Sequence, residues 1–130
     1  MTVTQLIAIV DDDTSAREAL SALVKAFGFV VAAFHSGAAF LASPQQRDTA
    51  CLIADMQMPD MTGLQLFLAL IEGGFTIPTI LVTAYPDDAT RRRALQAGVI
   101  GFLAKPVDSE TLLTCLRGAV GSSIESTQGT

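Results

Sequence analysis

The sequence predicts a single α/β domain in which five parallel strands form a doubly wound sheet with helices on both faces. Five short apolar runs alternate along the chain with segments whose apolar residues recur at helical spacing. Half of the 130 residues are hydrophobic and only 16% are charged, a composition that suits strands buried on both faces. In such a fold a ligand site is expected at the carboxyl ends of the strands.

The strands follow from continuous apolar runs that are bounded by polar residues, glycine or proline. They are expected at residues 6–10, 29–34, 51–54, 79–83 and 100–104. The first run stops at three consecutive acids, the third stops at Asp55, and Pro78 opens the fourth. A short continuous apolar run of this kind is typical of a buried parallel strand.

The helices are expected over about 14–27, 36–42, 64–71, 87–97 and 109–120. Short polar side chains that can accept hydrogen bonds from a first turn precede them, so the expected N-caps are Thr14, Ser36, Asp87 or Asp88, and Ser109. Glycines are expected to end the helices at Gly28, Gly73-Gly74 and Gly98. Residues 43–48 are expected to form a polar loop.

The domain is expected to span residues 1–120. Residues 121–130 are rich in Gly, Ser and Thr and have no apolar period, which indicates a flexible tail or the start of a linker. The N-terminus lacks the basic region and cleavage site of a signal peptide, and no apolar stretch approaches the ~20 residues that a membrane helix needs. A cytoplasmic protein without a membrane partner is therefore expected.

Composition argues against several other classes of function. The net charge of −5 opposes direct binding to a DNA backbone, and one histidine leaves little for a histidine-rich metal site or a Ser-His-Asp triad. His35 is expected in a loop or at a helix start. Cys51 and Cys115 sit in apolar runs and are interpreted as small buried hydrophobes rather than a disulfide or a metal site.

Polar residues gather where the predicted strands end. Asp11, Asp12 and Asp13 follow the first strand, and the third, fourth and fifth are followed or ended by Asp55, Thr83 and Lys105. Carboxylates that converge at one edge repel each other unless a cation joins them, and oxygen ligands without His or Cys favour a hard ion such as Mg²⁺. A cation, a central carboxylate, a hydroxyl and a lysine together suit phosphoryl transfer.

Over roughly residues 5–120 the chain resembles the receiver domains of two-component response regulators, and most of all the FixJ-like receivers attached to LuxR-type outputs. Five stretches carry the resemblance in order: Ile9-Val10-Asp11-Asp12-Asp13, Ala54-Asp55-Met56-Gln57-Met58-Pro59-Asp60-Met61-Thr62-Gly63, Ile80-Leu81-Val82-Thr83-Ala84, Ala97-Gly98, and Gly101-Phe102-Leu103-Ala104-Lys105-Pro106. The resemblance implies a flavodoxin-like sheet with strand order 2-1-3-4-5.

The resemblance also implies a role for each matching residue. Asp55 would be the phosphoacceptor, and Mg²⁺, with Mn²⁺ as a substitute, would be bound by Asp11, Asp12, Asp55 and the main-chain carbonyl of Gln57. Thr83 would hydrogen-bond the phosphoryl group and Lys105 would pair with it. The Lys105-Pro106 bond would be cis, and Phe102 would be the switch aromatic that moves with Thr83.

The implied partner is a histidine kinase that donates a phosphoryl group. The face formed by the fourth helix and fifth strand would then change and control a phosphorylation-promoted homodimer or an output domain, which is expected to be transcriptional. DNA would be bound only through such a separate domain. The chain would not be an enzyme beyond its own phosphorylation and dephosphorylation.

Some residues have a structural interpretation that competes with the functional one. Acids after a strand often complement a helix N-terminus, which we favour for Asp13 but not for Asp11 and Asp12. An aromatic in an apolar strand is most often core, although we place the switch role of Phe102 ahead. Arg91-Arg92-Arg93 is interpreted as a solvated helix face, with half of a salt-bridged dimer surface as the alternative.

Three other functions compete with a phosphoaccepting receiver. A haloacid dehalogenase-type phosphatase wants a second Asp two residues after the nucleophile, where this chain has Gln57. A cofactor-binding flavodoxin-like protein wants a phosphate-cradling loop after the first strand, so no organic cofactor is expected. A degenerate receiver that only binds partners would have lost one of the acids or the lysine. Pro86 stiffens the loop after Thr83, and Tyr85 is expected to cover part of the site.

Overall fold

The computed structural model describes the backbone of residues 5–128 and the side chains of residues 5–121. Its five strands form one sheet in the order β2-β1-β3-β4-β5, and all four neighbouring pairs are parallel. The strands are β1 Leu6–Val10, β2 Val30–Phe34, β3 Thr49–Asp55, β4 Thr79–Thr83 and β5 Gly101–Ala104. This confirms the predicted flavodoxin-like, doubly wound fold and its strand order.

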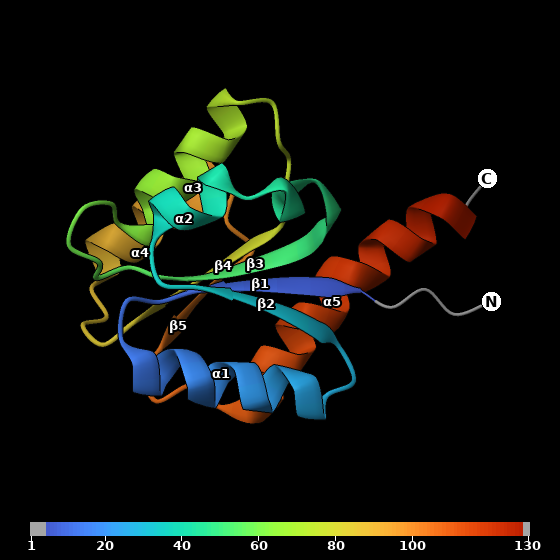
Figure 1. Cartoon of the computed structure of the whole chain (residues 1–130), viewed down its shortest axis with the longest axis horizontal. Helices are drawn as coiled ribbons and strands as arrows, with labels where there is room; N and C mark the ends of the chain where they lie inside the picture. The colour runs from blue at the N-terminus through green and yellow to red at the C-terminus, as the bar shows by residue number, and fades with distance from the viewer. Residues whose placement is uncertain (1–4, 129–130) are drawn as a thin grey trace.

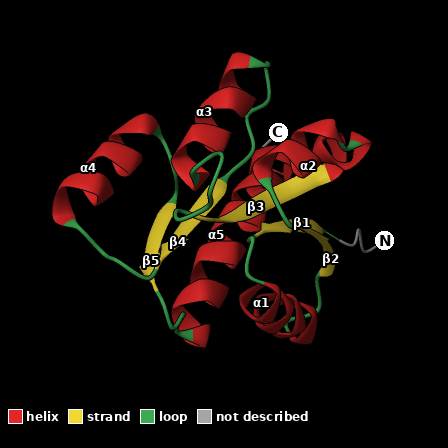
Figure 2. Cartoon of the chain, turned by 60° about the vertical axis from the view of Figure 1, so that its left-hand side comes forward, coloured by secondary structure: helices red, strands yellow, loops and turns green. Residues whose placement is uncertain are grey.

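The helices cover both faces of the sheet. They are α1 Thr14–Ala26, α2 Gly37–Ala42, α3 Gly63–Glu72, α4 Asp88–Ala97 and α5 Ser109–Gln128, with a short 3-10 helix at Pro44–Asp48. Helices α1 and α5 lie on one side of the sheet, and α2, α3 and α4 lie on the other (Figures 1 and 2). No helix within residues 5–128 is both long enough and apolar enough to cross a membrane.

The strands look continuously apolar because each of their two faces packs into its own core. In β1, Ile7 and Ile9 belong to the core beneath α1 and α5, whereas Ala8 and Val10 belong to the core beneath α2, α3 and α4. All four residues are at most 1% exposed. Side chains alternate between the faces of a strand, so apolar residues at every position are required when both faces are covered.

Two predicted helix caps are wrong by one residue. Asp13, not Thr14, caps α1, because its carboxylate accepts a hydrogen bond from the Ala16 N–H and its backbone is extended. Asp108, not Ser109, accepts a hydrogen bond from the Thr111 N–H at 2.9 Å. Thr14 and Ser109 already belong to the helices, so they cannot take the extended cap conformation. The caps predicted at Ser36 and Asp87 are present.

Several boundaries also differ from the prediction. Strand β3 begins at Thr49 because that residue pairs with Leu6 of β1. The expected polar loop contains the 3-10 helix at Pro44–Asp48, capped by Ser43. Helix α5 continues past its predicted end near Val120 to Gln128, since no proline interrupts the segment. Residues 1–4 and 129–130, which belong to the predicted N-terminus and tail, lie outside the described part of the chain.

Two glycines end helices in a conformation that other residues rarely adopt. Gly28 follows α1 with a φ of 102°, and Gly98 follows α4 with a φ of 118°. Both lie in the left-handed region, where a residue without Cβ is favoured. These turns send the chain back into β2 and β5. Because all strands of the sheet are parallel, the carboxyl ends of β1, β3, β4 and β5 lie at one edge.

Candidate functional site

Three aspartates converge at this edge of the sheet. Asp11 follows β1 directly and is fully buried, Asp12 is exposed, and Asp55 ends β3 with 4% of its surface exposed. One carboxylate oxygen from each of the three lies within 4.8 Å of the others. The sequence prediction that these acids would meet is therefore correct as geometry, and it follows from the strand order, which makes β1 and β3 neighbours.

Lys105 is the cation that the chain itself supplies to this cluster. Its Nζ lies 3.1 Å from Asp11 Oδ2 and 3.4 Å from Asp55 Oδ2. The Lys105 main-chain N–H donates to the Thr83 carbonyl oxygen at 2.8 Å, which fixes the lysine beside the end of β4. The peptide bond between Lys105 and Pro106 is cis.

The charges of this cluster are not balanced by the lysine. Burial, and after it the charge of Asp11, raises the pKa of Asp55 above its usual range, although the Gln57 N–H and Lys105 oppose the change. Burial lowers the pKa of Lys105, but the hydrogen bond and charge of Asp11, with the charge of Asp55, outweigh it and raise the pKa overall. Three carboxylates around one ammonium leave negative charge in excess. An all-oxygen donor set of this kind fits a hard divalent cation such as Mg²⁺.

The main chain around the aspartates is held by contacts that sequence reasoning did not identify. Arg17 of α1 donates from Nη1 to the Asp11 carbonyl oxygen at 2.8 Å, and the Asp13 N–H donates to Asp11 Oδ1 at 2.9 Å. Gly63, the first residue of α3, packs so closely that a Cβ atom there would lie 2.7 Å from the Asp55 carbonyl oxygen. In the sequence, these contacts are indicated only by a cationic residue in the first helix, Arg17, and by the glycine at position 63.

Thr83 ends β4 next to this cluster and is 1% exposed. Its hydroxyl donates to Gln57 Oε1 at 2.9 Å and accepts a hydrogen bond from the Tyr85 N–H at 3.0 Å. Gln57 is also tied to the acceptor strand, because its N–H donates to Asp55 Oδ1 at 3.3 Å. The main-chain N–H of Gln57 therefore contacts Asp55, and the side-chain bond of Gln57 to Thr83 was not predicted.

Phe102 lies in β5 opposite Leu81 of β4 and is partly buried. It borders a surface cavity of about 190 Å³ between β5 and the start of α4, which is also lined by Pro86, Asp87, Asp88, Arg91 and Ala104. Tyr85 is 74% exposed, so its ring covers little of the site, contrary to expectation. The side chains of Arg91, Arg92 and Arg93 are exposed, in agreement with a solvated helix face.

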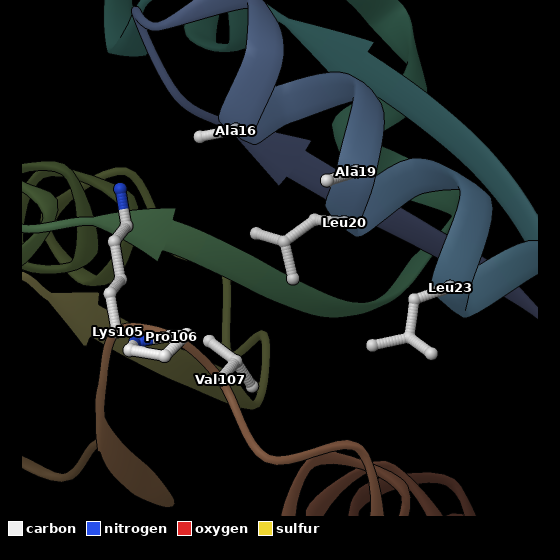
Figure 3. Close-up of a pocket in the computed structure, with 7 residues that line it drawn as sticks. All are labelled: Ala16, Ala19, Leu20, Leu23, Lys105, Pro106 and Val107. Carbon is white, nitrogen blue, oxygen red and sulfur yellow. The ribbon is translucent and has the colours of Figure 1, made fainter.

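An apolar groove of about 320 Å³ begins beside the lysine. It lies between α1, which contributes Ala16, Ala19, Leu20 and Leu23, and the segment after β5, which contributes Lys105, Pro106 and Val107 (Figure 3). The groove is thus an open apolar surface next to Lys105, the lysine that contacts Asp11 and Asp55.

The two cysteines lie away from this edge, whereas His35 lines a surface cavity of about 300 Å³ there together with Asp12 and Asp60. Cys51 and Cys115 are free thiols, buried and partly buried, which agrees with the structural interpretation of both. Burial raises the pKa of Cys51 to about 12, and the nearby Cys115 adds to the effect. His35 is exposed in the bend after β2.

Comparison with known proteins identifies the family. Residues 7–117 match the response regulator receiver domain family, a range that contains every expected site residue. The chain is 42% identical over 115 residues to the response regulator protein TmoT of Ectopseudomonas mendocina, covering 88% of this chain and 52% of that protein. It is 32% identical over 117 residues to the transcriptional regulatory protein FixJ of Azorhizobium caulinodans, covering 90% and 56%.

Solved structures agree with this assignment. The crystal structure of FixJ-N has a TM-score of 0.81 and 30% identity, covering 91% of this chain and 94% of that one. The response regulator StyR gives a TM-score of 0.86 at 34% identity, covering 98% and 64%. The chain spans about half the length of the curated relatives it matches. With the receiver fold, the acidic cluster and its lysine in place, the chain belongs to the response regulator receiver domain family of two-component systems.

Proposed function

We propose that this receiver domain accepts a phosphoryl group on Asp55 and thereby controls an output. The observation that carries the proposal is the contact of one buried carboxylate with both a lysine and an acidic cluster. Asp55 lies 3.4 Å from Lys105 Nζ and within 4.8 Å of carboxylate oxygens of Asp11 and Asp12. A nucleophilic carboxylate between a cation site and an ammonium is what phosphoryl transfer to an aspartate needs.

Asp11, Asp12, Asp55 and the main-chain carbonyl of Gln57 would hold Mg²⁺, or Mn²⁺ in its place. When bound, the ion neutralises charge on the phosphoryl oxygens. In the transfer step an Asp55 oxygen bonds to phosphorus while the phosphorus–nitrogen bond to a donor histidine breaks. Lys105, already beside Asp55, would pair with one phosphoryl oxygen. The Thr83 hydroxyl would donate a hydrogen bond to another.

The donor is proposed to be a histidine kinase, as the family implies. Its histidine must approach Asp55 from outside, and the apolar groove of α1 and Pro106-Val107 is the open surface beside Lys105 (Figure 3). A partner surface seated there would bury apolar area next to the acceptor. Ala19→Arg, which adds a charge to the groove, should slow transfer from a phosphorylated kinase but not the reaction with acetyl phosphate.

The response is proposed to pass through Thr83 and Phe102 to the face of α4 and β5. This face is where a phosphorylation-promoted homodimer or an output domain would read the change. Because one relative is named a transcriptional regulatory protein and the chain covers 56% of it, we propose a transcriptional output outside residues 1–120. Residues 121–130 would begin the connection to it, and DNA would be bound only by that output.

The chain is proposed to turn over no external phosphoester. A phosphatase that uses an aspartyl nucleophile would need an acid two residues after Asp55, and Gln57 stands there. Its side chain bonds Thr83 and cannot serve as an acid. The domain would therefore undergo only its own phosphorylation and dephosphorylation.

Beryllofluoride and acetyl phosphate test this function directly. With Mg²⁺, acetyl phosphate should add one phosphoryl group to the intact mass, and beryllofluoride should change the fluorescence of Tyr85. Asp55→Asn should abolish both responses, whereas Asp60→Asn, at an exposed acid in the following loop, should keep them. A wild-type protein that stays folded and responds to neither reagent at saturating Mg²⁺ would be a binding-only receiver, and the proposal would be wrong.

A further inference from the structure

Gln57 connects the acceptor strand to the end of β4. Its main-chain N–H donates to Asp55 Oδ1 at 3.3 Å, and its side-chain Oε1 accepts hydrogen bonds from the Thr83 hydroxyl at 2.9 Å and the Ala84 N–H at 3.3 Å. Thr83 and Ala84 lie 26 and 27 residues farther along the chain. One amide oxygen thus occupies two neighbouring donors at the edge where Asp55 ends its strand.

The hydroxyl donor of Thr83 is already in use. A hydroxyl carries one proton, and that of Thr83 goes to Gln57, while its oxygen accepts the Tyr85 N–H at 3.0 Å. The main chain of Thr83 is fixed as well, because its carbonyl oxygen accepts the Lys105 N–H at 2.8 Å. Thr83 therefore cannot donate to a phosphoryl group on Asp55 until it releases Gln57.

We infer that Gln57 is a positioning residue that holds the switch threonine in the unphosphorylated state and must be displaced when Asp55 is modified. This inference rests on the proposed phosphoacceptor function. A phosphoryl oxygen is a charged acceptor, and hydrogen bonds to it are about twice as strong as those to a neutral amide. The Thr83 hydroxyl therefore donates its hydrogen bond to the phosphoryl group instead of to Gln57. The exposed Gln57 side chain is then hydrogen-bonded by water.

Competition from Gln57 for the Thr83 hydroxyl destabilises the modified state by the free energy of the Gln57–Thr83 hydrogen bond. One neutral hydrogen bond corresponds to a factor of about five in an equilibrium constant. Gln57→Met keeps the length of the side chain and the main-chain carbonyl that the ion would use, but it removes the amide acceptor. With Mg²⁺, this variant should therefore bind beryllofluoride about fivefold more tightly than wild type.

A titration with beryllofluoride, followed by Tyr85 fluorescence and by the amide resonances of Ala84 and Tyr85, measures this difference. Before any beryllofluoride is added, the Ala84 amide proton of Gln57→Met should already be shifted and less protected from exchange. Gln45→Met is the matched control, since this exposed glutamine lies in the 3-10 helix remote from the site, and it should titrate like wild type.

A double-mutant cycle separates an effect through Thr83 from a general effect of the substitution. In a Thr83→Ala background, Gln57→Met should tighten beryllofluoride binding by less than about twofold, because the hydroxyl that Gln57 held is gone. Equal affinities of wild type and Gln57→Met, or the same gain in the Thr83→Ala background, would overturn the inference and leave the proposed function standing. A wild type that binds no beryllofluoride would refute the proposed function and the inference with it.

Discussion

The close approach of α3 to the acceptor strand makes Gly63→Ala a strong test of how the site is held. A Cβ atom at Gly63 would lie 2.7 Å from the Asp55 carbonyl oxygen and 2.9 Å from Leu81 Cδ2. Carbon contacts are most favourable at about 3.5–4.0 Å, so the helix or the strand must move. The closest obstacle is main chain and not the end of a flexible side chain, so relief by a side-chain rotation alone is not available.

The expected cost is that of overpacking a close-packed core. Such insertions destabilise proteins by about 1–3 kcal/mol, and we expect Gly63→Ala to lower the free energy of unfolding by that amount. Urea unfolding should show the midpoint reduced by about 1 M. Beryllofluoride binding should weaken too, because the displaced main chain is that of Asp55 itself.

Gly118→Ala provides the matched control. It introduces the same methyl group in helix α5 at a position where a Cβ would meet nothing within 4 Å. Alanine is favoured over glycine in a helix by about 0.8–1.0 kcal/mol, so this variant should be more stable than wild type. If Gly63→Ala unfolds at the wild-type urea concentration, or if Gly118→Ala is equally destabilised, the steric argument is wrong.

Three further predictions concern charge and reactivity. Lys105→Met leaves the buried Asp11 without its ion pair, so urea unfolding in EDTA should show the free energy of unfolding lowered by about 1–3 kcal/mol. This is less than for a fully buried pair because the lysine side chain is 24% exposed. Added Mg²⁺ should restore part of the lost stability, and equal stability with and without the lysine would contradict this prediction. The folded-state pKa of Asp55 is raised, so in EDTA the folded protein binds more protons than the unfolded one between the two pKa values, and wild-type stability should fall as the pH rises through that window. The stability of Asp55→Asn should not show this decrease with pH. If the urea midpoints of the two proteins changed in parallel with pH, the prediction would be wrong. Burial raises the pKa of Cys51 to about 12, so in the native protein iodoacetamide should modify Cys115 before Cys51, as peptide mass spectrometry can show; the reverse order would mean that β3 opens readily.

Much of this protein is determined by patterns that are local in the sequence. Apolar runs such as Leu6–Val10 and Thr79–Thr83 predict their strands because an apolar residue at every position suits a strand covered on both faces. The alternation of strands and helices then predicts a parallel sheet whose strand ends share one edge. Because Asp11, Asp55, Thr83 and Lys105 stand at those ends, their convergence could be predicted from order alone.

Other features depend on contacts between residues far apart in the chain, and these only the tertiary structure decided. Lys105 reaches Asp11 across 94 positions, and the Thr83 hydroxyl bonds a glutamine 26 positions away. Which of several donors meets which acceptor depends on distances of a few tenths of an ångström, and no spacing rule supplies these. The one-residue errors at the caps of α1 and α5 have a similar cause, since Asp13 and Thr14 are both suitable caps and only the backbone conformation distinguishes them. The sequence by itself thus determined which residues gather at the site, whereas the packing of α1, α3 and β5 against the sheet decided how their hydrogen bonds and charges are arranged.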